Sequence, residues 1–265
     1  MNSNRLRTQQ KFEGFFGGIT SEEWQSLKKR NILDYDLTAQ NIADLNESLA
    51  LDAKDLYFKG LLSITEAIFN IDKGLYSWAT VKLYYSIFYL LRCSLACKNI
   101  AIIRHMRDLY YVTVNQGESI KRATANQDHK AVIGLFQLLF KESDLLQSNT
   151  IEDINPYLWI MERREEVNYK DREFHEPSPP DFFYEINCLS TTDGIGSVLH
   201  RLVDDEFLLC FQEEYATLAI PLKRLILTKK DLLESGIDIG LSNEKREKIE
   251  SMLPFFDNKL FEAFF

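Results

Sequence analysis

The longest apolar and aromatic stretch of the chain is Trp78-Ala-Thr-Val-Lys-Leu-Tyr-Tyr-Ser-Ile-Phe-Tyr-Leu-Leu91. Of its last eleven residues, only Lys82 and Ser86 are neither apolar nor aromatic. Such residues also favour strands, but the aromatic side chains recur at helical spacing, and no Gly or Pro lies between Gly74 and Gly117. A helix that is apolar nearly all round must be surrounded by other helices. The stretch therefore predicts the central helix of a bundle, over residues 76–99.

Several helices are predicted before this central one. Thr20-Ser-Glu-Glu23 matches a capping box, in which the threonine hydroxyl and the glutamate carboxylate each accept a backbone amide of the other residue. This pattern predicts a short helix through Arg30. A second helix is expected within Leu37–Ala53 and a third over Lys54–Ile71, ending at Gly74, because glycine can supply a left-handed C-cap.

Further helices are expected after the central one. Ile102–Val114 reads as a second helical stretch, followed by a polar segment. Asp128 can cap a helix over His129–Phe140, with its phenylalanines and isoleucine directed inward. Asn155 followed by Pro156 predicts another start, since proline at the first helical position loses no hydrogen bond.

A proline-rich segment divides the chain. Glu176-Pro-Ser-Pro-Pro-Asp181 contains three of the six prolines and must stop the helical run. We therefore predict two domains: a helical bundle over residues 1–176 and a small α+β region over residues 177–265. The expected fold class is mainly α, an up-and-down helical bundle with a C-terminal α+β appendage.

Within the C-terminal region the patterns are mixed. Residues 197–203 and 207–220 read as a β-hairpin. Pro221 is expected to start a helix through Leu233, and Ser242 another through Leu253. The phenylalanine-rich tail, Phe255–Phe265, either packs on its own bundle or offers a surface to a partner.

The charge distribution is uneven. The net charge of −9, from 31 Lys and Arg against 40 Asp and Glu, argues against a protein that coats nucleic acid over its whole surface. The stretch from Arg92 to Lys130, however, contains seven basic residues and only three acidic ones. This stretch is either a phosphate-facing surface or an ordinary basic one. Its candidate nucleic-acid-binding residues are Arg104, Arg107, Lys121, Arg122 and Lys130.

Membrane spans, metals and cofactors are not expected. The N-terminal residues lack an apolar core, and no stretch approaches the roughly 18 apolar residues of a membrane span, so we expect a soluble cytoplasmic protein. The four cysteines and four histidines lack the spacing of metal ligands, and we expect the cysteines to be buried free thiols. The sequence lacks four motifs of common enzymes: Gly-x4-Gly-Lys-Ser/Thr, Gly-x-Gly-x-x-Gly, Gly-x-Ser-x-Gly and His-Glu-x-x-His.

The helix that begins at Pro156 carries the best candidate site. Arg164 and Asn168 are four residues apart and share a helical face beside apolar neighbours. A guanidinium in such a position can hold a phosphate through two parallel hydrogen bonds. Alternatively, Arg164 pairs with Glu165, Glu166 or an acid on another helix and only stabilises the bundle.

Three segments in order carry a family resemblance: Ser77–Tyr89, His129–Phe136 and Arg164–Tyr169. Together they resemble the prokaryotic HEPN superfamily, in its branch with Tyr-Tyr-x-x-Phe-His, His-Lys-x-Val-Ile-x-x-Phe and Arg-x-x-x-Asp-Tyr helices. The resemblance covers about Lys54–Asp171. It implies an up-and-down bundle of four or five helices, usually dimeric, from toxin–antitoxin, CRISPR or antiphage systems.

Many HEPN proteins are metal-independent ribonucleases in which an arginine and a histidine, separated by four to six residues on one helix, act together. The resemblance makes Arg164, Asn168, Tyr169 and His129 the candidate catalytic residues. This chain departs from the pattern, because no histidine follows Arg164 at that spacing, Tyr89 replaces the branch's histidine and Asn168 replaces its aspartate.

Two functions are therefore expected. The favoured one is an RNA-associated or accessory subunit, an adaptor or regulator of an antiphage or toxin–antitoxin system, acting as a homodimer or with an operon-encoded protein. The alternative is a metal-independent HEPN-type endoribonuclease with an atypical site, to which His129 or His175 supplies the histidine.

Overall fold

A computed structural model describes residues 5–17, 20–123 and 128–265. The described chain is mainly helical, as predicted, with one small antiparallel sheet of order β1-β2-β3. The α-helices are α1 (Arg7–Gly14), α2 (Ser21–Ser26), α3 (Lys29–Leu33), α4 (Ala39–Asp72), α5 (Tyr76–Cys97), α6 (Asp128–Phe140), α7 (Pro156–Glu165), α8 (Tyr184–Asp193), α9 (Ile195–Asp204), α10 (Glu213–Glu234), α11 (Asn243–Met252) and α12 (Asn258–Phe264). The other elements are β1 (Ile100–His105), β2 (Asp108–Thr113), β3 (Lys121–Arg122), a π-helical turn η2 (Glu166–Lys170) and the 3-10 turns η1 (Leu145–Gln147), η3 (Asp181–Phe183) and η4 (Leu208–Phe211).

The contacts divide the chain into two compact units. One comprises residues 1–56, 91–139 and 231–238, and the other comprises residues 57–90, 140–230 and 239–265. The helices α4, α5 and α10 contribute to both units. This division differs from the predicted boundary at residue 176, since each unit takes residues from both sides of it.

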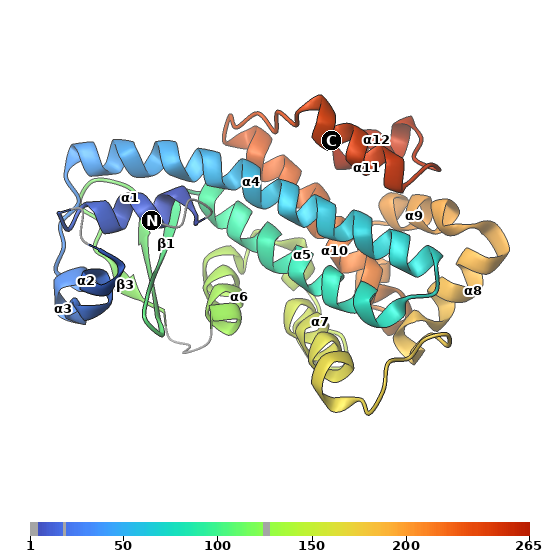
Figure 1. The fold of residues 1–265 in the computed structure, drawn as a ribbon. Helices are drawn as coiled ribbons and strands as arrows, with labels where there is room; N and C mark the ends of the chain where they lie inside the picture. The colour runs from blue at the N-terminus through green and yellow to red at the C-terminus, as the bar shows by residue number, and fades with distance from the viewer. Residues whose placement is uncertain (1–4, 18–19, 124–127) are drawn as a thin grey trace. The chain divides into compact units, whose positions relative to one another are not determined.

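The central helix is confirmed as α5. It runs antiparallel to α4, and the two lie side by side in Figure 1. They approach closely at Gly60 of α4, where an added Cβ would lie 2.7 Å from the Leu90 side chain. Leu83, Tyr84 and Ile87 of α5 are fully buried, so the apolar stretch supplies core on most sides of this helix.

The predicted break between two helices at Ala53 and Lys54 is wrong, because α4 is continuous through 34 residues. No glycine or proline occurs at that point, and Ala53 is buried, so propensity and packing both continue the helix. The end near Gly74 is confirmed, since its φ of 71° is left-handed.

The predicted helix over Ile102–Val114 is also wrong, because this segment forms the β1–β2 hairpin. The register pairs Ile100 with Thr113 and His105 with Asp108. Its β-branched and aromatic residues favour strands, but the two-residue turn, Met106–Arg107, lacks the glycine or asparagine that normally marks a hairpin. Met106 adopts a left-handed φ of 52° there.

The C-terminal region contains no strand among its described residues, which corrects the predicted α+β appendage. The segment expected to begin a hairpin forms α9, whose buried residues follow helical spacing: Ile195, Val198, Leu199 and Leu202. Pro221 lies inside α10 rather than at its start. Tertiary packing of amphipathic faces therefore prevails over strand propensity here.

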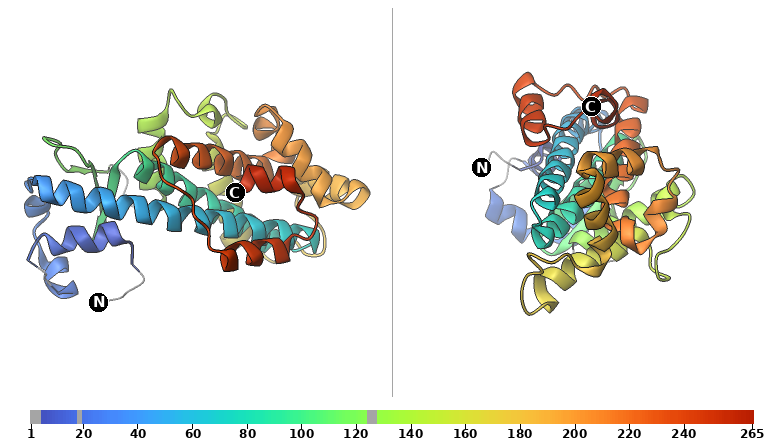
Figure 2. Two further views of the ribbon diagram at one scale, coloured as in Figure 1. Left: turned by 90° about the horizontal axis from the view of Figure 1, so that it is seen from above. Right: turned by 90° about the vertical axis from the view of Figure 1, so that its right-hand side faces the viewer.

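The phenylalanine-rich tail packs on its own chain. Leu260 and Phe264 of α12 are fully buried. The Tyr57 hydroxyl of α4 donates a hydrogen bond to the Phe264 carbonyl at 2.8 Å, so α12 lies against this part of α4 (Figure 2). Phe264 therefore belongs to the core of its own chain and is not available as a surface for a partner.

The other helix starts follow the predicted capping patterns. Thr20 and Glu23 form both hydrogen bonds of the capping box. Asn155 caps α7 with Pro156 at its first position, and Ser242 caps α11. The predicted helix after residue 128 is α6, which includes Asp128 and ends at Phe140 as expected. None of the described helices has both the length and the apolar character of a membrane span.

Candidate functional site

Arg164 lies near the end of α7, a helix that is anchored in the core. Trp159 and Ile160 of α7 are buried, and the Asn155 side chain accepts the Tyr157 amide at 3.0 Å. The buried Tyr157 hydroxyl donates to Asp144, whose carboxylate also pairs with the buried Arg224 at 3.2 Å. These contacts hold the α7 backbone and so position Arg164.

The Arg164 guanidinium is surrounded by tyrosine rings. Its Cζ lies 5.2 Å from the centroid of Tyr84, 5.7 Å from that of Tyr85 and 5.1 Å from that of Tyr169. Its Nη2 donates hydrogen bonds of 3.4 Å to the hydroxyls of Tyr85 and Tyr169. Cation–π attraction and two hydroxyl acceptors therefore hold the guanidinium in place.

No carboxylate among the described residues forms an ion pair with Arg164. Its Nε is buried and has no hydrogen-bond partner there. The neighbouring Arg163 also has a buried Nε without a partner among these residues, but its Nη1 pairs with Glu166 at 3.3 Å, and its guanidinium lies over Trp159 at 5.2 Å. Arg163 thus forms the ion pair with Glu166 that the sequence offers as the alternative role of Arg164. No carboxylate compensates the Arg164 charge among the described residues.

The protonation states keep this cluster positive. Burial raises the pKa of the Tyr84 hydroxyl well above its ordinary value, although the Arg164 charge opposes the shift. Burial lowers the pKa of Arg164, but the hydrogen bond to Tyr85 and the other tyrosine oxygens raise it by more. A neutral Tyr84 and a charged Arg164 are therefore the states at neutral pH.

The turn η2 determines which residue accompanies Arg164. In a regular helix Asn168, four positions on, would share its face. The π-helical turn is wider, with hydrogen bonds between residues five apart, so Tyr169 comes next to Arg164 instead. Asn168 is exposed. No glycine or proline in residues 164–170 marks this widening in the sequence.

A second cluster lies at the start of α5. The Glu176 carboxylate accepts the Ser77 amide at 2.7 Å and the Ser77 hydroxyl at 2.8 Å. Nearby, His175 Nε2 lies 2.7 Å from Asp171 Oδ2. Glu176 therefore caps α5 from a distant part of the chain, a contact that local capping patterns could not predict.

His129 is half-buried in the first turn of α6. It belongs to the unit of residues 91–139, whereas Arg164 belongs to the other unit. The grouping of His129 with Arg164 therefore stays a prediction.

The basic residues of the stretch from Arg92 to Lys130 are partly neutralised. Arg104 pairs with Asp128, Lys121 lies 3.7 Å from Glu118, and Arg122 shares Asp108 with Lys29. Arg107 and Lys130 are exposed and form no ion pair among the described residues. Ion pairing reduces the net positive charge that this surface presents to a phosphate.

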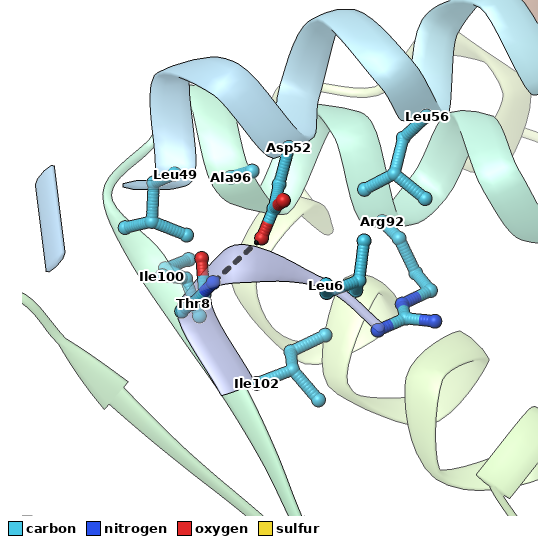
Figure 3. Close-up of a pocket in the computed structure, with 9 residues that line it drawn as sticks. All are labelled: Leu6, Thr8, Leu49, Asp52, Leu56, Arg92, Ala96, Ile100 and Ile102. Atoms are coloured by element: carbon cyan, nitrogen blue, oxygen red, sulfur yellow. Dashed lines mark hydrogen bonds between the residues drawn. The ribbon is translucent and has the colours of Figure 1, made fainter. Parts of the chain in front are cut away.

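A small cavity lies beside α1 (Figure 3). Asp52 of α4 accepts the amides of Arg7 and Thr8 at 2.9 Å each and so caps α1. The cavity, of about 20 Å³, is also lined by Arg92, and the Thr8 hydroxyl has no hydrogen-bond partner among the described residues. It has room for about one water molecule and none for a substrate.

The described residues contain no group of three or more His, Cys, Asp or Glu side chains that could hold a metal ion. The four cysteines are free thiols, of which Cys188 alone is not buried. Burial raises the pKa of the Cys210 thiol to about 12, so this cysteine is unreactive at neutral pH.

No family model matches the chain, and no curated protein or solved structure shows significant similarity to it.

Proposed function

We propose that this protein is a HEPN-like, RNA-associated accessory subunit of a prokaryotic antiphage or toxin–antitoxin system, and that RNA contacts the Arg164 cluster. This cluster comprises Arg164, Tyr84, Tyr85 and Tyr169. The observation that carries the proposal is the uncompensated Arg164 charge among three tyrosines, of which Tyr169 is 70% exposed. In this role the protein acts as a homodimer or with an operon-encoded partner.

The chemistry of the cluster suits a nucleotide. A guanidinium donates two parallel hydrogen bonds to a phosphate, and tyrosine hydroxyls can add more. An exposed tyrosine ring offers a face on which a base can stack. In a protein of net charge −9, recognition of RNA has to come from such a local arrangement, since the overall charge repels a polyanion.

An accessory role fits the protonation chemistry better than catalysis does. General acid–base catalysis needs a group whose pKa lies near the working pH. The residues in contact with Arg164 are tyrosines, and the pKa of Tyr84 is moved even further from neutrality. A proton shuttle for the ribose 2′-hydroxyl is therefore missing from the contacts of Arg164 among the described residues.

The proposal is tested by RNA binding to an Arg164→Ala variant, measured by fluorescence anisotropy at fixed salt. Loss of a charge-assisted contact worth about 1.5–3 kcal/mol should weaken binding roughly 10- to 100-fold. Arg246→Ala is a matched control, because Arg246 also lies over two rings of the same unit, those of Phe261 at 4.8 Å and Phe265 at 5.5 Å. Equal affinities for both variants and the wild type would refute the proposal.

A second candidate function, the metal-independent ribonuclease, is favoured by the His175–Asp171 pair. A carboxylate 2.7 Å from Nε2 orients the ring, as the orienting group does in known acid–base pairs. If the protein cleaves RNA, the activity should resist chelators and be lost in both His175→Ala and Arg164→Ala. Cleavage that survives His175→Ala would exclude this histidine.

A further inference from the structure

The accessible residues of α5 in this unit form a single stripe. Trp78, Lys82, Tyr85 and Tyr89 are exposed or half-buried, whereas the residues between them are buried. Their spacing of four, three and four places them on one helical face. We call this stripe the α5 seam; it contains no acidic residue and spans about 16 Å at 1.5 Å per residue.

Other elements of the same unit add rings and charges to the seam. The Phe174 ring lies 5.9 Å from that of Trp78, and Arg164 hydrogen-bonds Tyr85. The rings of Tyr85 and Tyr89 stack with centroids 6.3 Å apart, and Lys59 Nζ lies 5.9 Å from the Tyr89 centroid. Aromatic faces and cations therefore alternate along the α5 seam.

The exposure of these rings calls for an explanation. Trp78 is 50% exposed and Phe174 is 52% exposed, although each would gain free energy from burial. Lys82 pairs with Glu66, but Arg164 and Lys59 have no carboxylate partner among the described residues. The α5 seam and its neighbours therefore combine apolar rings with a net positive charge, although the protein as a whole is acidic. Such a surface is complementary to a polyanion that also has flat apolar faces.

We propose that the α5 seam stacks the unpaired bases of single-stranded RNA while Arg164 holds its backbone. This inference rests on the proposed function and specifies its substrate. A duplex cannot use the seam, because its bases already stack on one another and present only their edges. Trp78 and Tyr89 are the stacking residues, Tyr85 holds Arg164 in place, and Lys59 is the cation at the far end.

Trp78 provides the readout. The chain has three tryptophans, and the other two, Trp24 and Trp159, are only 4% and 0% exposed. Stacking of a base on Trp78 should therefore quench the exposed component of the intrinsic fluorescence. The probes are a short unstructured RNA, the same RNA in a duplex, and an abasic oligonucleotide of equal length and charge.

Trp78→Ala and Tyr89→Leu should each weaken binding of the unstructured RNA about tenfold, since one stacked base is worth about 1–3 kcal/mol. Binding of the duplex and of the abasic oligonucleotide should change less than about twofold, because their contacts are electrostatic. Trp78→Phe should keep the affinity and lose the signal. Tyr184→Leu, at a tyrosine of α8 outside the seam that is 58% exposed, should change neither the affinity nor the fluorescence signal.

The possible failures are distinguishable. If the wild type binds none of the RNAs, or if Arg164→Ala binds normally, the proposed function fails. If Arg164→Ala weakens binding, but Trp78→Ala and Tyr89→Leu leave the RNA affinity unchanged and the abasic oligonucleotide binds as tightly as the RNA, only the stacking proposal fails. If Trp78→Ala changes the oligomeric state by light scattering and leaves RNA affinity intact, the α5 seam is a protein interface, and the proposal is wrong.

Discussion

Single side chains of this protein are distinguished by what compensates their charges. Arg163 and Arg164 are neighbours, yet one is paired with Glu166 and the other is held by three tyrosine rings. An ion-paired arginine has already used its strongest acceptor, whereas a ring-held arginine keeps its preference for a carboxylate or phosphate. This difference explains why Arg164 is the better candidate for binding an anion.

Asp108 gives a prediction about pH at the same scale. The hydrogen bond from Lys29 lowers its pKa, burial opposes that shift, and Arg122 lowers the pKa further. A carboxyl group whose pKa is lower in the folded state stabilises the fold above its unfolded pKa of about 3.9. This contribution is lost as the pH falls through the lower, folded pKa.

We therefore expect urea unfolding to show that Asp108→Asn lowers the free energy of unfolding at neutral pH. The difference from the wild type should shrink as the pH falls below about 4, because the wild-type carboxyl group then becomes protonated too. A difference that is constant from neutral to acidic pH would mean that packing, rather than charge, accounts for the effect.

At the scale of elements, the closest approach in the α4–α5 pair is at Gly60. A Cβ at this position would lie 2.7 Å from two atoms of the Leu90 side chain. Gly60→Ala should therefore cost about 1–3 kcal/mol from overpacking, partly offset by the better helix propensity of alanine. Thermal or urea unfolding measures the difference.

Gly134 of α6 is the matched control. A Cβ there would meet no atom within 4 Å, and its φ is not left-handed. Gly134→Ala should therefore stabilise the protein, by up to about 1 kcal/mol, from helix propensity and from the reduced freedom of the unfolded chain. If both variants stabilise the protein, the close approach of α4 and α5 is not present in solution.

The predictability of the elements depends on where their signals lie. The starts of α2, α7 and α11 were predicted correctly because Thr20, Asn155 and Ser242 bond to amides within the same turn. The sequence does not predict the β1–β2 hairpin, because its turn, Met106–Arg107, contains neither glycine nor asparagine. It predicts a strand in place of α9, because apolar residues at short spacing fit both the helical and the strand period.

At the scale of the whole molecule, the C-terminal tail belongs to the fold. Phe264 is fully buried, and its carbonyl accepts the Tyr57 hydroxyl. We expect Phe264→Ala to cost about 3–5 kcal/mol in urea unfolding, as the truncation of a core phenylalanine does. Phe265→Ala, at a half-buried position, should cost less than half as much. Equal small losses would show that the tail is detached in solution.

The candidate site combines two kinds of information. Aromatic composition and spacing alone predicted the α5 helix and drew attention to Arg164, because a helical period and a run of apolar residues are properties of one segment. Three features arise only in the folded chain. Arg163, and not Arg164, pairs with Glu166; the turn η2 brings Tyr169, and not Asn168, next to Arg164; and Glu176 caps α5. They depend on contacts between distant residues and on a local change of helical period, which residue order does not encode in any single turn.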